Sequence, residues 1–576
     1  MKSLALNSLW FLCVLCASVV NGFTLDREAF SFTNYDLHLE VDPGQHRLGV
    51  RGKVTLRNDR PTPEQVAILQ ISSSLRWHAL GSLGKPVQFV TQPLASDIDH
   101  TGGLSEAIVT LPQPVAPHAT VDLDIAYEGV IEVDATRLTR IGTPEDLAKN
   151  SDWDVISPSL TVVRGAGYVA WYPIAAEVAN LSEGDLFAVL ARWKQREAGS
   201  QMRFGLHDPN HDNDADQGVM VCSGEGLNAV TLEGKAKFPT AQCIIRDVAH
   251  SAPTFALAHY GMVERPSIVV NNLPTHAVAA EAYAGAGQTM VPFITNWFGA
   301  PREKVQIADL DNPDYAPFES GPLLLTSLVS SDPVRAGLAV AHQLTHAAFS
   351  SPRPWIDEGL AHFAQALYLE HEKGRQAALD YMAAHRSALS QVEGSPGSED
   401  GASDSLVNTV NEELYRSKAM CVWWMLRDMI GDPALKKALA FYKPEQDSDP
   451  SYMPRLIGAQ TQRDLQWFFD DWVYHDRGLP DFNLESAFSQ KRPNNSYLLT
   501  VTVENLGTAG AEVPVIVKFA TGEVTKRLEL RAKNQATIRI ETPEAAREVI
   551  VNDGSVPESS AAGHTYKVAP PKDQLP

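Results

Sequence analysis

Cysteines, basic residues and long apolar runs are scarce in this sequence of 576 residues. There are five cysteines, and their spacing does not resemble a cysteine-based metal site. Lys and Arg number 48 against 70 Asp and Glu, which gives a net charge of −22. An acidic chain repels phosphate groups, which argues against nucleic acid and anionic lipid as partners. Beyond residue 22, no run reaches the roughly 20 apolar residues of a membrane span.

The length and hydrophobic content of the chain set the expected architecture. A chain of 576 residues is too long for a single core, so about two to four domains are expected. The hydrophobic share of 44% excludes wholesale disorder. No internal repeat of fixed period is visible, which argues against a solenoid.

The first 22 residues have the pattern of a secretory signal peptide. Lys2 supplies a positive charge, residues 4–20 are largely apolar, and residues 20–22 offer small side chains before a cleavage point. We therefore predict a secreted or periplasmic protein without a membrane span in the mature chain. The alternative is that the segment stays uncleaved as an anchor.

Removal of this segment leaves three cysteines, Cys222, Cys243 and Cys421. Cys222 and Cys243 adjoin strand-like runs and could close a loop of about 20 residues in an oxidising compartment, worth on the order of 3 kcal/mol. We expect this disulfide if the two residues lie on neighbouring strands, and unrelated buried thiols are the alternative. Cys421 has a helical, Trp-rich context typical of a buried thiol.

The hydrophobic pattern divides the chain into β, helical and β regions, which predicts a multidomain α+β fold. Alternating apolar positions begin in a hairpin at residues 32–58 and recur to about Val270. They predict an N-terminal, mostly antiparallel β domain over residues 23–273. Helical spacing dominates residues 274–482. Alternation returns over residues 490–576 and predicts a C-terminal β-sandwich.

The helical region carries the clearest chemical pattern. Its expected helices span residues 277–298, 334–349, 355–372, 375–392, 415–430 and 463–474. His342 and His346 are four residues apart, which places both imidazoles on one helix face, as a shared metal ion requires. Glu358 follows on the next expected helix. Two His and one Glu, with a fourth position left for water, form the ligand set of a catalytic zinc site.

Four short motifs in this region resemble those of the aminopeptidase N-like zinc metallopeptidases, which include membrane alanyl aminopeptidases and leukotriene hydrolases. That family shows G-A-M-E-N, H-E-x-x-H, N-E-G-F-A and a Tyr close to a Lys, in this order. The corresponding stretches here read A-P-F-E-S at 316–320, H-Q-L-T-H at 342–346, D-E-G-L-A at 357–361 and Y-R-S-K at 415–418. The resemblance covers about residues 254–482 and implies a thermolysin-like zinc domain.

The resemblance also implies a role for individual residues. It assigns His342, His346 and Glu358 to one zinc ion per chain. It implies that Glu319 holds the free α-amino group of a peptide substrate, since a carboxylate pairs with an ammonium group. It further implies that Tyr415 donates a hydrogen bond to the tetrahedral oxyanion, because a phenol near the metal supplements its Lewis acidity.

Three features depart from the family pattern. The spacer between His346 and Glu358 is shorter, and Tyr415 precedes Lys418 by three residues where the family commonly has two. The third concerns the catalytic position 343, which holds Gln where the family has the Glu that acts as general base. A carboxamide can orient a water but cannot accept and return a proton near neutral pH. Loss of such acid–base help typically lowers a rate by about 10²–10⁴.

Two functions are therefore expected from the sequence. The first is a secreted zinc-dependent aminopeptidase that hydrolyses N-terminal residues of peptides, with activity weakened by Gln343. The alternative is a catalytically inactive, zinc-binding pseudopeptidase that binds peptide N-termini or a protein partner through the same cleft. Residue 343 is not a metal ligand, so zinc binding is expected in both cases.

Overall fold

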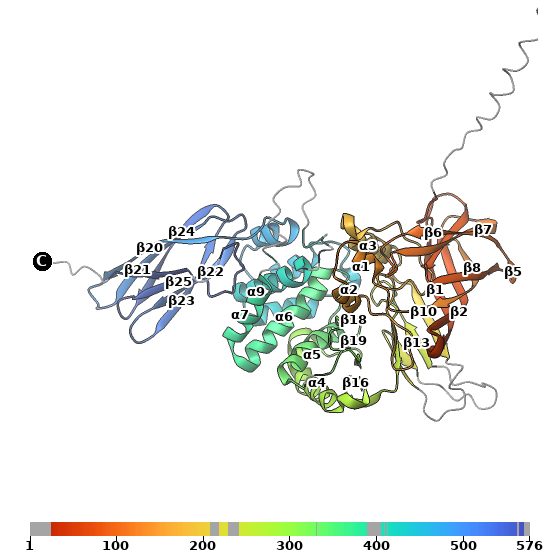
Figure 1. The fold of residues 1–576 in the computed structure, drawn as a ribbon. Coiled ribbons are helices and arrows are strands. Elements are labelled where there is room, and N and C mark those ends of the chain that lie inside the picture. Colours follow the sequence, from red (N-terminus) through yellow and green to blue (C-terminus); the bar gives the residue numbers. More distant parts are fainter. Residues whose placement is uncertain are drawn as a thin grey trace, which may run out of the picture.

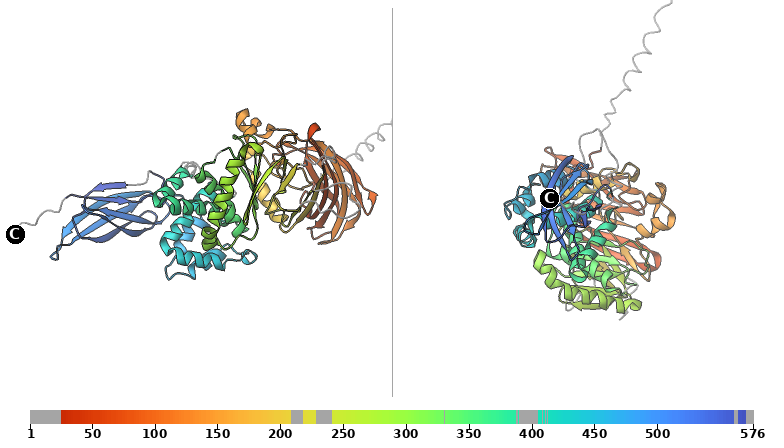
Figure 2. Two further views of the ribbon diagram at one scale, coloured as in Figure 1. Left: turned by 90° about the horizontal axis from the view of Figure 1, so that it is seen from below. Right: turned by 90° about the vertical axis from the view of Figure 1, so that its left-hand side faces the viewer.

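A computed structural model describes residues 25–207, 218–227, 241–329, 331–386, 389, 405–407, 409, 411, 413–560 and 564–569. The predicted signal peptide lies outside the described residues. Figure 1 shows three regions in a row, with β-sheets at both ends and helices between them. A view from below shows the same succession (Figure 2). The expected multidomain α+β fold class is confirmed.

The N-terminal region is built on an eight-stranded sheet with the order β12-β13-β10-β1-β2-β8-β4-β5. Only the pair β1 and β10 in this sheet is parallel, so the expected, mostly antiparallel arrangement is confirmed. The strands are β1 (Phe30–Asp42), β2 (Arg47–Asn58), β4 (Leu75–Ser82), β5 (Lys85–Pro86), β8 (Thr120–Val130), β10 (Gln201–His207), β12 (Glu225–Leu227) and β13 (Ala241–Ile245). A second sheet has the order β3 (Glu64–Ser72), β7 (Gly103–Val115) and β6 (Gln88–Ala95). The alternating apolar residues of these strands form one buried core.

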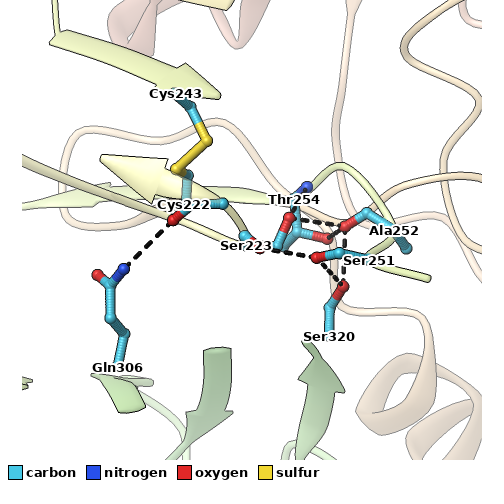
Figure 3. Close-up of a disulfide and its surroundings, with 9 residues drawn as sticks. Cys222, Ser223, Cys243, Ser251, Ala252, Thr254, Gln306 and Ser320 are labelled. Carbon is cyan, nitrogen blue, oxygen red and sulfur yellow. Dashed lines mark hydrogen bonds between the residues drawn. A yellow bond between two sulfur atoms is a disulfide. The ribbon is translucent and has the colours of Figure 1, made fainter. Parts of the chain in front are cut away.

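A small sheet and a disulfide lie where this region meets the helices. The sheet has the order β11 (Val219–Cys222), β14 (Phe255–Ala258) and β9 (Thr161–Val163). Cys222 on β11 forms the expected disulfide with Cys243 on β13, with the Cα atoms 6.4 Å apart (Figure 3). The two strands belong to different sheets, so the bridge forms although the stated condition, neighbouring strands, is not met within one sheet. The bridge ties two sheets together.

A five-stranded mixed sheet follows and crosses the predicted boundary between residues 273 and 274. Its order is β15 (Gly261–Arg265), β16 (Ile268–Asn272), β17 (Val305–Asp309), β19 (Leu323–Thr326) and β18 (Phe318–Ser320). Strands β17, β18 and β19 lie within the part of the chain that was expected to be helical, and they are only three to five residues long. Such short apolar runs carry little periodicity of their own. The domain limits stay predictions.

The helices largely follow the expected ones. The predictions at residues 277–298, 334–349 and 355–372 are confirmed by α4 (Ala277–Phe298), α5 (Pro333–Ala348) and α6 (Pro354–Lys373), and α7 (Arg375–Ala384) is described over a shorter range than expected. The helix expected at 415–430 begins with a π-helical turn, Glu413–Lys418, before α9 (Ala419–Ile430), where Cys421 is buried. The one expected at 463–474 reduces to α12 (Gln466–Phe469) and a second π-helical turn, Asp470–Tyr474. Five further helices were not expected: α1 (Thr136–Arg140), α2 (Glu145–Ser151), α3 (Leu186–Arg196), α10 (Asp432–Phe441) and α11 (Tyr452–Gly458).

Among the described residues, no helix combines the length and the apolar character needed to cross a bilayer.

The C-terminal region consists of two antiparallel sheets. One has the order β20 (Phe482–Lys491), β21 (Tyr497–Asn505) and β24 (Asn534–Thr542), and the other has the order β23 (Glu523–Leu530), β22 (Ala511–Lys518), β25 (Glu548–Val551) and β26 (His564–Lys567). The alternating residues Leu499, Val501 and Val503 are buried, as their spacing predicts. They belong to one continuous core that also includes the helices of the central region. The sandwich therefore packs directly on the region that carries the site.

Candidate metal centre

Helix α5 presents two histidines from its C-terminal half. The helix begins after Asp332, whose carboxylate accepts the N–H of Val334 at 3.0 Å, and Pro333 occupies its first position. The four-residue spacing then puts His342 and His346 one turn apart. Their Nε2 atoms lie 3.1 Å from each other, so both imidazoles offer the same ring nitrogen to one point.

Helix α6 brings Glu358 to the same point. The two helices approach closely because Gly337 of α5 has no side chain, and a Cβ there would stand 2.2 Å from the hydroxyl oxygen of Tyr368. The carboxylate oxygens of Glu358 lie 3.7 Å from Nε2 of His342 and 3.7 Å from Nε2 of His346. All three side chains can therefore reach one ion.

Glu319 reaches this point from the five-stranded sheet. It lies on the edge strand β18, where its backbone is paired with Leu324 of β19. Its Oε2 atom is 2.7 Å from Nε2 of His342. Donor atoms of Glu319, His342, His346 and Glu358 all lie within 4.8 Å of one another. We call these four residues the donor cluster.

Contacts from the N-terminal region hold β18 on both sides of Glu319. The ring of Phe318 packs edge-on against Tyr168, with centroids 5.2 Å apart. On the other side, the hydroxyl of Ser320 donates to the carbonyl of Ala252 at 3.0 Å (Figure 3). The position of the Glu319 backbone is therefore set by residues far away in the sequence.

Asp357 supports His346 from outside the donor cluster. Its Oδ2 lies 3.4 Å from Nδ1 of His346, and its Oδ1 accepts the N–H of Ser351 at 2.8 Å. Metal-binding histidines commonly donate their second ring N–H to a carboxylate, which fixes the tautomer that leaves Nε2 for the metal. Sequence analysis missed this role, although Asp357 immediately precedes Glu358.

The ionisable groups of the cluster shift one another's pKa values. Burial alone would raise the pKa of the Glu319 carboxyl, but the neighbouring His342 lowers it below its usual range. Burial alone would lower the pKa of His346, but Asp357, followed by Glu358, raises it to about 9. The pKa of Asp357 is likewise lowered, against the effect of burial, by His346. Glu319 and Asp357 are thus held ionised.

Gln343 is completely enclosed by protein, next to His342 in the chain. Its side chain is 0% exposed, and neither atom of its amide group hydrogen-bonds to any residue that the structure describes. Buried polar atoms almost always have a partner, which is protein or ordered water. The amide group of Gln343 is therefore not part of a hydrogen-bond network of the described residues.

The π-helical turn Glu413–Lys418 carries Tyr415 and Arg416. Such turns are frequent at functional sites. Tyr415 is partly buried against the helical core, and Nε of Arg416 lies 3.3 Å from Oε2 of Glu358. The turn that was expected to supply a hydrogen-bond donor thus adjoins the donor cluster, and the role of Tyr415 stays a prediction. Sequence analysis missed Arg416, although it directly follows Tyr415.

His362 is a further residue that sequence analysis missed. It follows Glu358 by one turn of α6, and its ring centroid lies 5.0 Å from that of His342. Burial, and then the charge of His342, lower the pKa of His362 well below its usual range. A neutral imidazole therefore lies against the cluster. The four-residue spacing from Glu358 was the available signal.

The residues of the cluster fit a divalent metal ion. Two imidazoles and one or two carboxylates are a common donor set for zinc, and Asp357 adds the outer carboxylate that such sites usually have. Oε2 of Glu319 and Oε2 of Glu358 are buried and have no hydrogen-bond partner among the described residues, which fits donor atoms held for a cation. The predicted ligands His342, His346 and Glu358 are thus brought together, and so is Glu319.

Comparisons with known proteins give similarities at the level of structure. No protein-family model matches the sequence, and no curated protein matches it. A mutant of an M1 zinc metallopeptidase from Deinococcus radiodurans, bound to a Tyr-Ser-Ala substrate, is similar with a TM-score of 0.49 and 16% identity, over 79% of this chain and 96% of that one. A second structure of an M1 zinc metallopeptidase from the same organism gives a TM-score of 0.47 and 16% identity, over 79% of this chain and 95% of that one.

Proposed function

We propose that this chain is a zinc-dependent, aminopeptidase-like hydrolase of peptides whose turnover is limited by Gln343. The observation that carries the proposal is the donor cluster, in which four side chains from three separate elements converge within 4.8 Å. Imidazole and carboxylate donors suit zinc. The order of the motifs around these residues resembles that of the aminopeptidase N-like family.

Zinc bound in the cluster would supply a Lewis acid that polarises the carbonyl of the bond to be cleaved. The protein's own groups then decide what binds and in which orientation. Glu319 pairs with the ammonium group of a peptide N-terminus by a charge-assisted hydrogen bond. This pairing would restrict the substrates to peptides with a free N-terminus. Tyr415 would donate its phenolic proton to the oxygen on which negative charge develops.

Gln343 sets the rate. Its carboxamide can hold a water by hydrogen bonds, but it has no basic site that takes up a proton near neutral pH. The missing proton transfer is expected to lower turnover by about 10²–10⁴ relative to a site with a carboxylate at this position. The slow step is therefore expected to be chemistry and not substrate binding.

A second candidate function is binding of peptide N-termini, or of a protein partner, without cleavage. The observation that favours it is the carboxamide of Gln343, which cannot act as a general base, beside a donor cluster whose four residues are all present. Both functions use the same metal and the same Glu319.

We also propose that the protein is exported through the N-terminal segment 1–22. The disulfide between Cys222 and Cys243 supports this, because disulfides persist in oxidising compartments and are rare in the cytosol. Sequencing of the N-terminus of the exported protein tests it. We expect the mature chain to begin at residue 23, and a retained residue 1 would indicate an anchor instead.

The test of the function is hydrolysis of a panel of aminoacyl chromogenic substrates by the purified, zinc-loaded protein. Slow cleavage that stops on chelation and returns with zinc supports the peptidase. The double variant His342→Ala/His346→Ala serves as the metal-free control. Absence of cleavage together with zinc-dependent binding of a peptide would favour the second function. Cleavage that persists in the double variant would contradict both.

A further inference from the structure

We propose that Glu319 is the fourth metal ligand in the peptide-free protein, so that the centre is closed until a substrate opens it. The assignment of the metal, and of the peptide ammonium as the opening group, rests on the proposed function. In this account Glu319 exchanges one partner for another. It leaves the metal as it pairs with the ammonium group, and one coordination position becomes vacant.

The donor atoms of the cluster lie close enough to one another to share one ion after small movements. Ligands about 2.0–2.2 Å from a tetrahedral zinc ion lie roughly 3.3–3.6 Å from each other. Nε2 of His342 lies 2.7 Å from Glu319, 3.1 Å from His346 and 3.7 Å from Glu358. The carboxylate of Glu319 is thus closer to His342 than the predicted ligand Glu358 is, at a distance that is shorter than the separation of two ligands on one ion. Small movements of the side chains would bring all four onto one ion.

The backbone holds Glu319 in this position from an element other than the helices. Strand β18 is paired with β19, Phe318 packs on Tyr168, and Ser320 bonds to Ala252. Histidines from α5 and Glu358 from α6 approach from two directions, and β18 supplies a third. Sites built on fixed strands and helices need little reorganisation when the metal binds.

The charges around the cluster also favour the second carboxylate. Arg416 lies 3.3 Å from Glu358 and offsets the charge of that ligand. A divalent ion brings two further positive charges to the cluster, and Glu319 is a second carboxylate that can offset them from 2.7 Å beside His342.

One consequence is that zinc and a peptide N-terminus compete for Glu319. By linkage, a peptide that pairs with Glu319 must weaken zinc binding, and zinc must weaken peptide binding by the same factor. Without this competition, the ammonium group would bind Glu319 with no loss of zinc affinity. The two accounts therefore predict different zinc affinities in the presence of an ammonium compound, and this affinity can be measured without any turnover.

The first measurement is the zinc affinity of the full-length protein, obtained by competition with a chelator. Glu319→Gln keeps the size of the side chain and removes its charge, and it is expected to weaken zinc binding by about 100-fold or more, which exceeds the typical loss for an outer partner. The control is Glu281→Gln on the exposed face of α4, where Glu281 pairs with Arg265. Alanine amide serves as the ammonium probe, and it is expected to weaken zinc binding to the wild type but not to Glu319→Gln.

The second measurement is a crystal structure of the zinc-loaded protein without peptide. We expect a carboxylate oxygen of Glu319 at about 2.0–2.2 Å from the metal. Zinc bound by His342, His346 and Glu358 with a water in place of Glu319 would overturn the inference and leave the proposed function standing. Unchanged zinc affinity in Glu319→Gln would overturn it as well. Absence of zinc binding by the wild type would overturn both.

Discussion

Position 343 holds a carboxamide, which cannot take up a proton near neutral pH, where the proposed function would use a carboxylate. Gln343 is buried and unpartnered among the described residues, while the neighbouring metal donors are all present. A substitution at this position would therefore change turnover without removing the residues that bind the metal. In the proposed function, metal binding depends on the donor cluster and turnover depends on residue 343.

Gln343→Glu is expected to raise aminopeptidase turnover by about 10²-fold or more, because it restores a group that can accept and return a proton. The gain should appear in kcat, with little change in substrate affinity, since Glu319 is untouched. Steady-state kinetics on an aminoacyl chromogenic substrate, with and without chelator, checks it. If the wild type already cleaves rapidly and the substitution adds nothing, another group serves as base.

Asp357→Ala is expected to weaken zinc binding by about 10–100-fold, because it removes the carboxylate that orients His346. The same substitution leaves the N–H of Ser351 without its acceptor. Chelator competition checks the affinity. Asp380→Ala, at an exposed position on α7 where Asp380 accepts a hydrogen bond from Gln376, is the matched control. Equal affinities of the two variants would show that Asp357 does not support the metal.

At the scale of elements, the short strand β18 links the N-terminal region to the metal centre. A buried pair anchors this link: Arg164 binds Asp154 at 2.8 Å, with side chains 1% and 0% exposed. The guanidinium lies between the rings of Trp153 and Tyr168, 3.8 Å from each centroid. Trp153 in turn donates to the carbonyl of Ala316, just before β18.

Arg164→Ala is expected to lower the free energy of unfolding by about 3–5 kcal/mol, because it leaves the carboxylate of Asp154 buried without its cation. Urea unfolding followed by fluorescence measures the effect. Arg203→Ala provides the contrast, since Arg203 and Asp36 form a pair that is 59% and 39% exposed. Such exposed pairs contribute roughly 0–1 kcal/mol. An equal decrease in the free energy of unfolding in the two variants would contradict the anchoring role of Arg164.

The disulfide makes a similar link between two sheets. It closes a loop with a sequence separation of 21 residues, and chain entropy predicts a contribution of about 3 kcal/mol for a loop of this size. Cys222→Ala/Cys243→Ala should lose about that much stability. Mass mapping of peptides without reduction should show the bridge in the wild type. A midpoint of unfolding that does not change on reduction would contradict the prediction.

At the scale of the whole molecule, the period of the hydrophobic residues predicted the β, helical and β regions. It did not predict the mixed sheet that lies between the first two. Long amphipathic helices such as α4, α5 and α6 repeat their pattern over four or more turns, so their limits were predicted within about one residue. Strands β17, β18 and β19 are too short for such a pattern. Their place depends on the pairing of β17 with β16, of β19 with β17 and of β18 with β19. The mixed sheet that carries Glu319 was therefore not predicted.

The candidate site was predicted where spacing along one helix was sufficient. His342 and His346 share a helix face, and the order of the motifs added Glu358 and Glu319. The proximity of Arg416 to Glu358, and of Asp357 to Nδ1 of His346, depends on how three elements pack. Contacts of this kind have no periodic signal in the sequence.

The most direct test of the central claim is the metal content of the purified protein. Elemental analysis is expected to find about one zinc per chain, held by His342, His346 and Glu358. The double variant His342→Ala/His346→Ala should hold almost none, whereas His371→Ala, at an exposed position on the same helix as Glu358, should match the wild type. A wild-type zinc content no higher than that of the double variant would contradict the account.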